Sequence, residues 1–158
     1  YLYATTDITT APIHIMDLTN EGSITGTSST VTGAYAGQAI TGYGTRLFVS
    51  NSNSQMFILS ITSPTSPTSL GSYAASGVVN SIAINQTSSL AYLGIASAGT
   101  QEFKVVDFTT PGSMSLYGSY NPAGNNSYTQ VIYDPATDRC YIGTNMTSGE
   151  FVVLRPGP

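Results

Sequence analysis

The chain has 158 residues and a mass of 16.5 kDa, enough for one domain. Only 8% of its residues are charged although 41% are hydrophobic, a composition too apolar for a disordered tail. Four Lys and Arg side chains and a net charge of −4 cannot form a basic surface that follows phosphates, so we expect no nucleic-acid partner.

The chain opens on an apolar piece, Leu2-Tyr3-Ala4, and similar aromatic-centred pieces return three times. Their central aromatics lie at positions 3, 48, 92 and 141, so the steps are 45, 44 and 49 residues. A period of this length predicts a repeat architecture. No charged and apolar leader precedes Tyr1, so we expect any signal or anchor to have been removed or to lie outside this sequence. No apolar run reaches about 18 residues, and we expect no membrane span.

Three further pieces accompany each aromatic one. A second apolar run follows it, at 13–18, 56–61, 103–108 and 151–154. A Pro-bearing loop ending in Gly-Ser-Tyr comes next, at 62–73 and 109–120, with a blurred counterpart at 22–26. A fourth piece, at 38–40, 80–84 and 129–133, precedes the next aromatic one. The pieces are short, rich in β-branched and aromatic residues and bounded by turn formers, which predicts strands and essentially no α-helix.

Four strands in each repeat predict an all-β fold, a β-propeller-like domain of about 3.5 blades of four antiparallel strands. The single domain covers 1–158, with repeats at approximately 1–45, 46–89, 90–138 and a partial one at 139–158. With strands labelled a (inner) to d (outer), the chain reads bcd, abcd, abcd, abc. We expect another chain or missing sequence to complete the ring, a strained four-bladed ring being the third alternative. Open strand edges favour an assembly over a free monomer.

The stretches 56–73, 103–120 and 134–144 resemble the LVIVD and YVTN-type β-propeller repeats of bacterial and archaeal surface proteins. In that pattern an apolar strand ending in Asp leads to a Ser/Thr-Pro loop and a Gly-Ser-Tyr strand. The resemblance implies a propeller scaffold, secreted or attached to the cell surface, and specifies no chemistry. Ser60 departs from it, standing where the pattern has Asp.

The polar residues form no catalytic constellation. His14 is the single imidazole, and we expect it to be a packed or surface side chain. Asp17 and Asp107 end equivalent strands, where a carboxylate caps the following loop. Asp134 and Asp138 bracket a turn and are candidate ligands of Ca²⁺, a cation that prefers oxygen. We otherwise expect no metal, no cofactor and no enzymatic activity.

Other residues bear on surface and core. Asn85, Asn125 and Asn145 begin N-glycosylation sequons and are candidate glycan sites. Cys140 is single, lies in an apolar strand and is expected to be a small buried side chain. Seven tyrosines lie at repeat-equivalent or strand-edge positions: Tyr3, Tyr43, Tyr73, Tyr92, Tyr120, Tyr128 and Tyr141. We expect most of them to fill the wedge between blades, and the alternative is an aromatic binding face.

Low charge and a surface rich in hydroxyl groups favour an extracellular or cell-surface location. The sequence therefore predicts a non-enzymatic structural or adhesive module, a subunit of a pilus, filament or surface layer. Its partners would be further copies of itself or another surface protein, and also glycans. The alternative is a secreted propeller that binds a carbohydrate or small ligand. A hydrolase or lyase with carboxylates on its inner strands is the third class.

Overall fold

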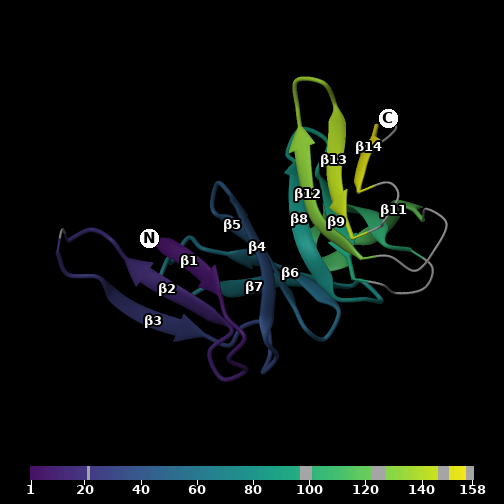
Figure 1. Ribbon diagram of the computed structural model, residues 1–158. Helices are drawn as coiled ribbons and strands as arrows, with labels where there is room; N and C mark the ends of the chain where they lie inside the picture. Colours follow the sequence, from purple (N-terminus) through teal and green to yellow (C-terminus); the bar gives the residue numbers. More distant parts are fainter. Residues whose placement is uncertain (21, 97–100, 122–126, 146–149, 156–158) are drawn as a thin grey trace.

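A computed structural model of the chain describes residues 1–20, 22–96, 101–121, 127–145 and 150–155. They form four antiparallel sheets that stand side by side as blades (Figure 1). Blade 1 contains β1 (Leu2–Thr5), β2 (Ile13–Asp17) and β3 (Thr25–Ser29), and blade 2 contains β4 (Gly37–Tyr43), β5 (Arg46–Asn51), β6 (Gln55–Ser60) and β7 (Thr68–Ala74). Blade 3 contains β8 (Val79–Asn85), β9 (Leu90–Ile95), β10 (Phe103–Asp107) and β11 (Ser115–Tyr120), and blade 4 contains β12 (Tyr128–Asp134), β13 (Arg139–Thr144) and β14 (Phe151–Leu154).

This architecture confirms the predicted all-β propeller-like fold. In the described part of the chain the only helix is a single 3₁₀ turn, η1 (Pro111–Ser113). No described helix has the length and apolar character needed to cross a bilayer.

The order of strands shows which are inner and which are outer. Blades 2 and 3 pair their strands in chain order, from β4 to β7 and from β8 to β11. The strands β4, β8 and β12 pack against one another and are the inner strands. β1 pairs with β2 and packs beside β4. Among the described residues, blade 1 therefore has no inner strand and blade 4 no outer strand, as the repeat predicts.

The hairpins between inner strands and their neighbours turn on residues in the left-handed region. Gly44 (φ 56°), Ser89 (φ 54°) and Asp138 (φ 51°) lie at corresponding places before β5, β9 and β13. Small or short polar residues tolerate this conformation best. The predicted repeat boundaries at 45/46, 89/90 and 138/139 fall inside these hairpins. Each sequence repeat thus joins three strands of one blade to the inner strand of the next.

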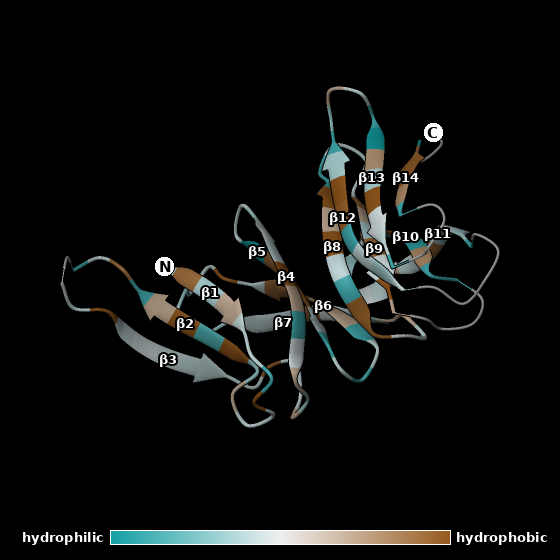
Figure 2. Cartoon of the chain, viewed as in Figure 1, coloured by the Kyte–Doolittle hydropathy of each residue, from teal (hydrophilic) through white to brown (hydrophobic). Residues whose placement is uncertain are grey.

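The outer strand of blade 1 lies next to the piece that the sequence indicated. The blurred counterpart of the Gly-Ser-Tyr loop is at 22–26, and β3 begins within it, at Thr25. Gly22 has φ 86°, a turn conformation that a strand does not use. β3 contains only Thr, Gly and Ser and is pale along its length in Figure 2.

Apolar cores lie between successive blades. We call the face of a blade that is turned toward the next blade in the chain its front face, and the opposite one its rear face. Residues paired directly across strands share a face. The buried front-face residues are Ile13 and Ile15 in blade 1, Phe48, Met56 and Ile58 in blade 2, and Tyr92, Phe103 and Val105 in blade 3. Their rear-face partners are Leu47, Val49 and Leu59 in blade 2, Ala91, Leu93 and Val106 in blade 3, and Val131, Cys140 and Ile142 in blade 4.

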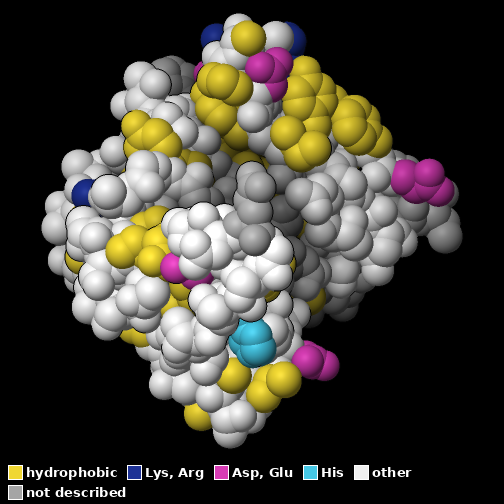
Figure 3. All heavy atoms as spheres, turned by 90° about the vertical axis from the view of Figure 1, so that its left-hand side faces the viewer, with side chains coloured by type: hydrophobic (Ala, Val, Ile, Leu, Met, Phe, Trp, Pro, Cys, Tyr) yellow, Lys and Arg dark blue, Asp and Glu magenta, His cyan; other side chains and the backbone are white. Residues whose placement is uncertain are grey.

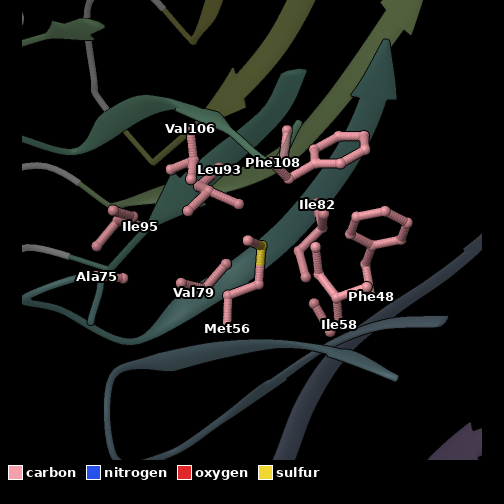
Figure 4. Close-up of a cluster of buried hydrophobic side chains, with 12 residues drawn as sticks. Phe48, Met56, Ile58, Ala75, Val79, Ile82, Leu93, Ile95, Val106 and Phe108 are labelled. Atoms are coloured by element: carbon pink, nitrogen blue, oxygen red, sulfur yellow. The ribbon is translucent and has the colours of Figure 1, made fainter. Parts of the chain in front are cut away.

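The core between blades 2 and 3 shows how these faces interlock. Figure 4 shows Phe48, Met56 and Ile58 opposite Leu93 and Val106. The rings of Phe48 and Phe108 meet edge to face with centroids 4.9 Å apart, a favoured aromatic geometry. Each interface is thus a two-sided apolar contact between neighbouring sheets.

Candidate functional site

The front face of blade 4 is apolar and has no blade against it in the described structure. Ile132 pairs with Tyr141, and Tyr141 pairs with Val153, so the three side chains form a row across the sheet. Phe151 extends this row, with its ring stacked on Tyr141 at a centroid distance of 5.9 Å. Ile132 is 57% exposed, Phe151 62% and Val153 46%. Together these four residues form a contiguous apolar surface.

Blade 3 carries the same row at equivalent positions. Ala83 pairs with Tyr92, which pairs with Val105, and the ring of Phe103 stacks on that of Tyr92 at 6.3 Å. There blade 4 covers the row, so that Tyr92 is 0% exposed and Phe103 2%. The row on blade 4 therefore repeats a surface that is buried one blade earlier.

A groove borders this blade on its outer side. It has a volume of about 250 Å³ and lies between β11 and β14; it is lined by Phe103, Val105, Tyr117, Gly118, Ser119, Tyr120, Leu154 and Arg155. Tyr117 is 49% exposed and Tyr120 is 41% exposed. Among the described strands β14 pairs only with β13, so no described strand covers its other edge.

The rear face of blade 1 is the opposite end of the row of blades. Leu2 pairs with Met16 and Ala4 pairs with His14, which places these four side chains on one face. Leu2 is 49% exposed. The view onto that end in Figure 3 shows the chain's one histidine at the surface, with hydrophobic side chains near it.

His14 lies in β2 between two buried isoleucines, on the opposite face from them, as predicted. Its Nε2 atom is buried without a hydrogen-bond partner in the described structure. A catalytic base needs an orienting partner and a nucleophile within hydrogen-bond reach, and no hydrogen bond to this side chain is present in the described structure.

The two loop-capping carboxylates are confirmed. The Asp17 Oδ1 atom accepts hydrogen bonds from the Thr19 hydroxyl at 2.7 Å and from the Thr19 N–H at 2.9 Å. The Asp107 Oδ1 atom accepts one from the Thr109 N–H at 2.7 Å. These bonds, to Thr19 and Thr109 respectively, hold the pKa of both carboxyl groups below the usual range. Ser60, which replaces Asp at the equivalent position, makes a weaker version at 3.5 Å to the Thr62 N–H.

Asp134 and Asp138 are engaged within the protein. Asp134 accepts bonds from the Thr137 hydroxyl at 2.7 Å and the Ala136 N–H at 2.9 Å, the first of which does most to lower its pKa. Asp138 accepts a bond from the Tyr133 hydroxyl at 3.0 Å. The described residues contain no group of three or more His, Cys, Asp or Glu that could hold a metal. Calcium binding here stays a prediction, and a cation would have to displace these hydrogen bonds.

The three sequon asparagines fall in different surroundings. The Asn85 amide nitrogen, to which a glycan would be attached, donates a 2.8 Å bond to the Tyr133 hydroxyl of the next blade, and the residue is 7% exposed. Asn145 is exposed, and its side-chain oxygen accepts a bond from the Ser127 N–H. Asn125 lies outside the described residues. Attachment at Asn85 would break a contact between blades, whereas Asn145 offers its amide nitrogen at the surface.

The tyrosines divide between packing and surface. Tyr92 and Tyr128 are fully buried between blades 3 and 4, while Tyr3, Tyr73 and Tyr141 are half-buried. Tyr43 and Tyr120 are exposed. The prediction that tyrosines pack between neighbouring blades is thus confirmed for only some of them.

Cys140 is fully buried in the core between blades 3 and 4, as predicted. Burial raises the pKa of its thiol to about 12. The thiol is therefore protonated at neutral pH and serves as a small apolar side chain.

Sequence reasoning missed several buried polar contacts between blades. Ser50 Oγ donates to the Val79 carbonyl at 2.8 Å, and Ser81 Oγ accepts from the Val131 N–H at 3.0 Å. Lys104 Nζ donates to the Ala75 carbonyl at 2.7 Å, while Glu102 is fully buried and its carboxylate has no hydrogen-bond partner within the described ranges. A charged residue inside an apolar run was the available signal for Lys104, and Glu102 lies just before that run.

Known proteins support the fold. No protein-family model and no curated protein matches the chain. It is similar to the β-propeller domain of Cps50 (Swd1) from Myceliophteria thermophila, with a TM-score of 0.68 at 12% identity over 91% of this chain and 52% of that one. It is also similar to the C-terminal WD40 domain of Sif2, with a TM-score of 0.62 at 12% identity over 99% of this chain and 46% of that one. A structural genomics protein of unknown function from Bacteroides thetaiotaomicron gives 0.59 at 17% identity, over 84% of this chain and 33% of that one.

The chain is therefore a β-propeller repeat protein. It spans about half the length of the Cps50 and Sif2 propeller chains and a third of the Bacteroides protein. At these identities the similarity is one of fold, and the function has to be argued from the surfaces described above.

Proposed function

We propose that the chain is a non-enzymatic structural or adhesive module of a cell-surface assembly, such as a pilus, filament or surface layer. Its repeats would belong with the LVIVD and YVTN-type propellers of microbial surfaces. Its partners would be other protein chains, bound through the ends of its row of blades.

The observation that carries this proposal is the front face of blade 4. Phe151 and Val153 are 62% and 46% exposed, whereas the equivalent Phe103 and Val105 are 2% and 6% exposed. An exposed apolar patch of this kind marks an interaction surface. The active site of a glycoside hydrolase needs two carboxyl groups held roughly 5–10 Å apart across the substrate. Asp17 and Asp107 instead accept hydrogen bonds from the loops that follow their strands.

The location is supported by composition. With 8% charged residues and a calculated isoelectric point near 4.5, the surface relies on hydroxyl and amide groups for its solubility. Immunogold labelling of intact cells that produce the protein tests this. We expect gold on the cell surface or along surface appendages, and labelling confined to the cell interior would overturn the proposal.

A second candidate function, carbohydrate binding, is favoured by the groove between β11 and β14. It combines two exposed tyrosines, Tyr117 and Tyr120, with the guanidinium of Arg155. Aromatic rings stack against sugar faces and guanidinium groups hydrogen-bond hydroxyls. A glycan array on the wild-type chain tests it, with Tyr117→Ala as the binding-deficient variant and Tyr43→Ala as the control. A saturable signal lost only in the first variant would favour this function.

A further inference from the structure

We propose that the front face of blade 4 binds the rear face of blade 1 of a second copy of this chain, head to tail. The inference rests on the proposed function, for which it names the partner.

The three interfaces inside the chain define what a front face binds. Each one places a row of large apolar side chains against the rear face of the following blade. The free row on blade 4 has the same register and the same stacked Tyr–Phe pair as the row on blade 3. Its complement is therefore the rear face of a blade built on this repeat.

Blade 1 supplies such a rear face. Leu2, Ala4 and Met16 occupy the positions that hold Leu47, Val49 and Leu59 in blade 2, and Cys140, Ile142 and Leu154 in blade 4. All are aliphatic or sulfur-containing side chains that pack against rings without needing hydrogen bonds. His14 stands where blade 2 has Phe57 and blade 4 has Val152. Neither the front row nor these three rear positions contain a charged side chain, and the charged residues of the front face, Asp134 and Arg139, are paired with each other across β12 and β13 at the hairpin end of the sheet.

Two copies joined head to tail would bring together eight blades, at the upper end of the usual four to eight. A head-to-tail contact closes into a ring when the rotation fits and grows into a filament when it does not.

Two blocking variants test the contact, one on each face. Phe151→Glu places a charge on the front face, and Leu2→Glu places one on the rear face. Both positions are exposed, so neither change disturbs a core. Leu70→Glu, at a 38% exposed position on β7 of blade 2, lies on neither end blade and is the matched control. Circular dichroism verifies that each variant is folded, and sedimentation velocity over a range of concentrations measures self-association.

We expect the wild type and Leu70→Glu to form dimers or longer assemblies, and each blocked variant to lose at least tenfold in association constant. Mixing the two blocked variants gives the sharpest result. The Leu2→Glu copy keeps a functional front face and the Phe151→Glu copy keeps a functional rear face, so the mixture should form a 1:1 pair and nothing larger. A wild type that stays monomeric, or a mixture that fails to pair, would overturn the inference.

A cross-linking measurement covers the case in which a blocked variant does not fold. A Phe151→Cys copy and a Leu2→Cys copy should form a mixed disulfide when combined, while Leu2→Cys alone should not link to itself. The buried Cys140 does not compete, because its thiol is fully covered. Self-linking of Leu2→Cys at the same rate would instead indicate a symmetric contact and exclude the head-to-tail one. Surface labelling of cells without self-association would leave the proposed function standing and remove this inference alone.

Discussion

The hydroxyl groups of two tyrosines in β12, Tyr128 and Tyr133, differ in their hydrogen bonding. The Tyr128 hydroxyl is buried and has no hydrogen-bond partner among the described residues, and burial raises its pKa. The Tyr133 hydroxyl accepts a bond from Asn85 at 2.8 Å and donates one to Asp138 at 3.0 Å. A buried polar group without a partner costs stability, whereas a bonded one contributes to it.

The same substitution should therefore act in opposite directions at these two positions. We expect Tyr128→Phe to raise the free energy of unfolding by about 1 kcal/mol and Tyr133→Phe to lower it by about 1–2 kcal/mol. Urea denaturation of both variants at pH 7 measures the difference. Two changes of equal sign would show that the hydroxyl groups do not decide the outcome.

The hydrogen bonds that cap these loops predict that the stability of the folded chain decreases at acidic pH. Hydrogen bonds to Thr19 and Thr109 lower the pKa of Asp17 and Asp107 in the folded chain. A carboxyl group with a lowered pKa in the folded state contributes stability above its unfolded pKa of about 4, and loses that contribution as the pH falls through the folded value.

Ser60 suggests the variant that isolates this effect. Asp107→Ser copies the cap that blade 2 already uses. We expect the drop in melting temperature between pH 7 and pH 3 to be smaller in this variant than in the wild type. Thermal unfolding at the two pH values checks it, and an unchanged drop would mean that other carboxyl groups account for the acid sensitivity.

At the scale of elements, the outer strands of blades 2 and 3 share a Gly-Ser-Tyr motif but use its glycine differently. A Cβ atom on Gly71 would lie 1.9 Å from the Pro111 carbonyl oxygen of η1, because β7 packs directly against that turn. A Cβ atom on Gly118, the equivalent residue of β11, would meet nothing within 4 Å.

This pair gives a matched test of blade packing. Gly71→Ala should destabilise the chain by about 1–3 kcal/mol, since the backbone of η1 has to move. Gly118→Ala should change stability by less than about 0.5 kcal/mol, as surface substitutions usually do. Chemical denaturation of both variants decides it; equal losses would indicate that glycine is needed for the strand itself and not for the contact.

The elements themselves follow largely from local sequence. Short β-branched and aromatic runs with turn formers between them form strands wherever they occur, so the period of the aromatic pieces locates the blades. The boundaries of the blades are harder to predict than their number of residues, because a sequence repeat and a blade do not begin at the same strand. Each repeat unit joins three strands of one blade to the first strand of the next. The signal for β3 was weak, because Thr, Gly and Ser show no apolar alternation.

On the scale of the whole molecule, the described residues form an open row of four blades. The rear face of blade 1 and the front face of blade 4 are the two ends of this row. If these ends join between copies, association and folding are linked, and apparent stability rises with protein concentration. We therefore expect the melting temperature of the wild type to increase between micromolar and hundred-micromolar solutions.

The front-face variant Phe151→Glu should remove this dependence, while Leu70→Glu should retain it. Differential scanning calorimetry at several concentrations measures both. A wild-type melting temperature that is constant across the range would contradict the linkage.

The sequence alone determined the all-β class, the order of strands within the repeat, the incomplete first and last blades of the described structure and the caps at Asp17 and Asp107. These depend on local chemistry and on a period, both of which are written along the chain. Tertiary structure decided which tyrosines are buried, that Asn85 joins two blades, and that Phe103 and Phe151 differ in exposure despite equal places in the repeat. The physical reason is that burial depends on whether a neighbouring blade covers a face. The local sequences of the two strands are similar, and they do not determine whether that neighbouring blade is present.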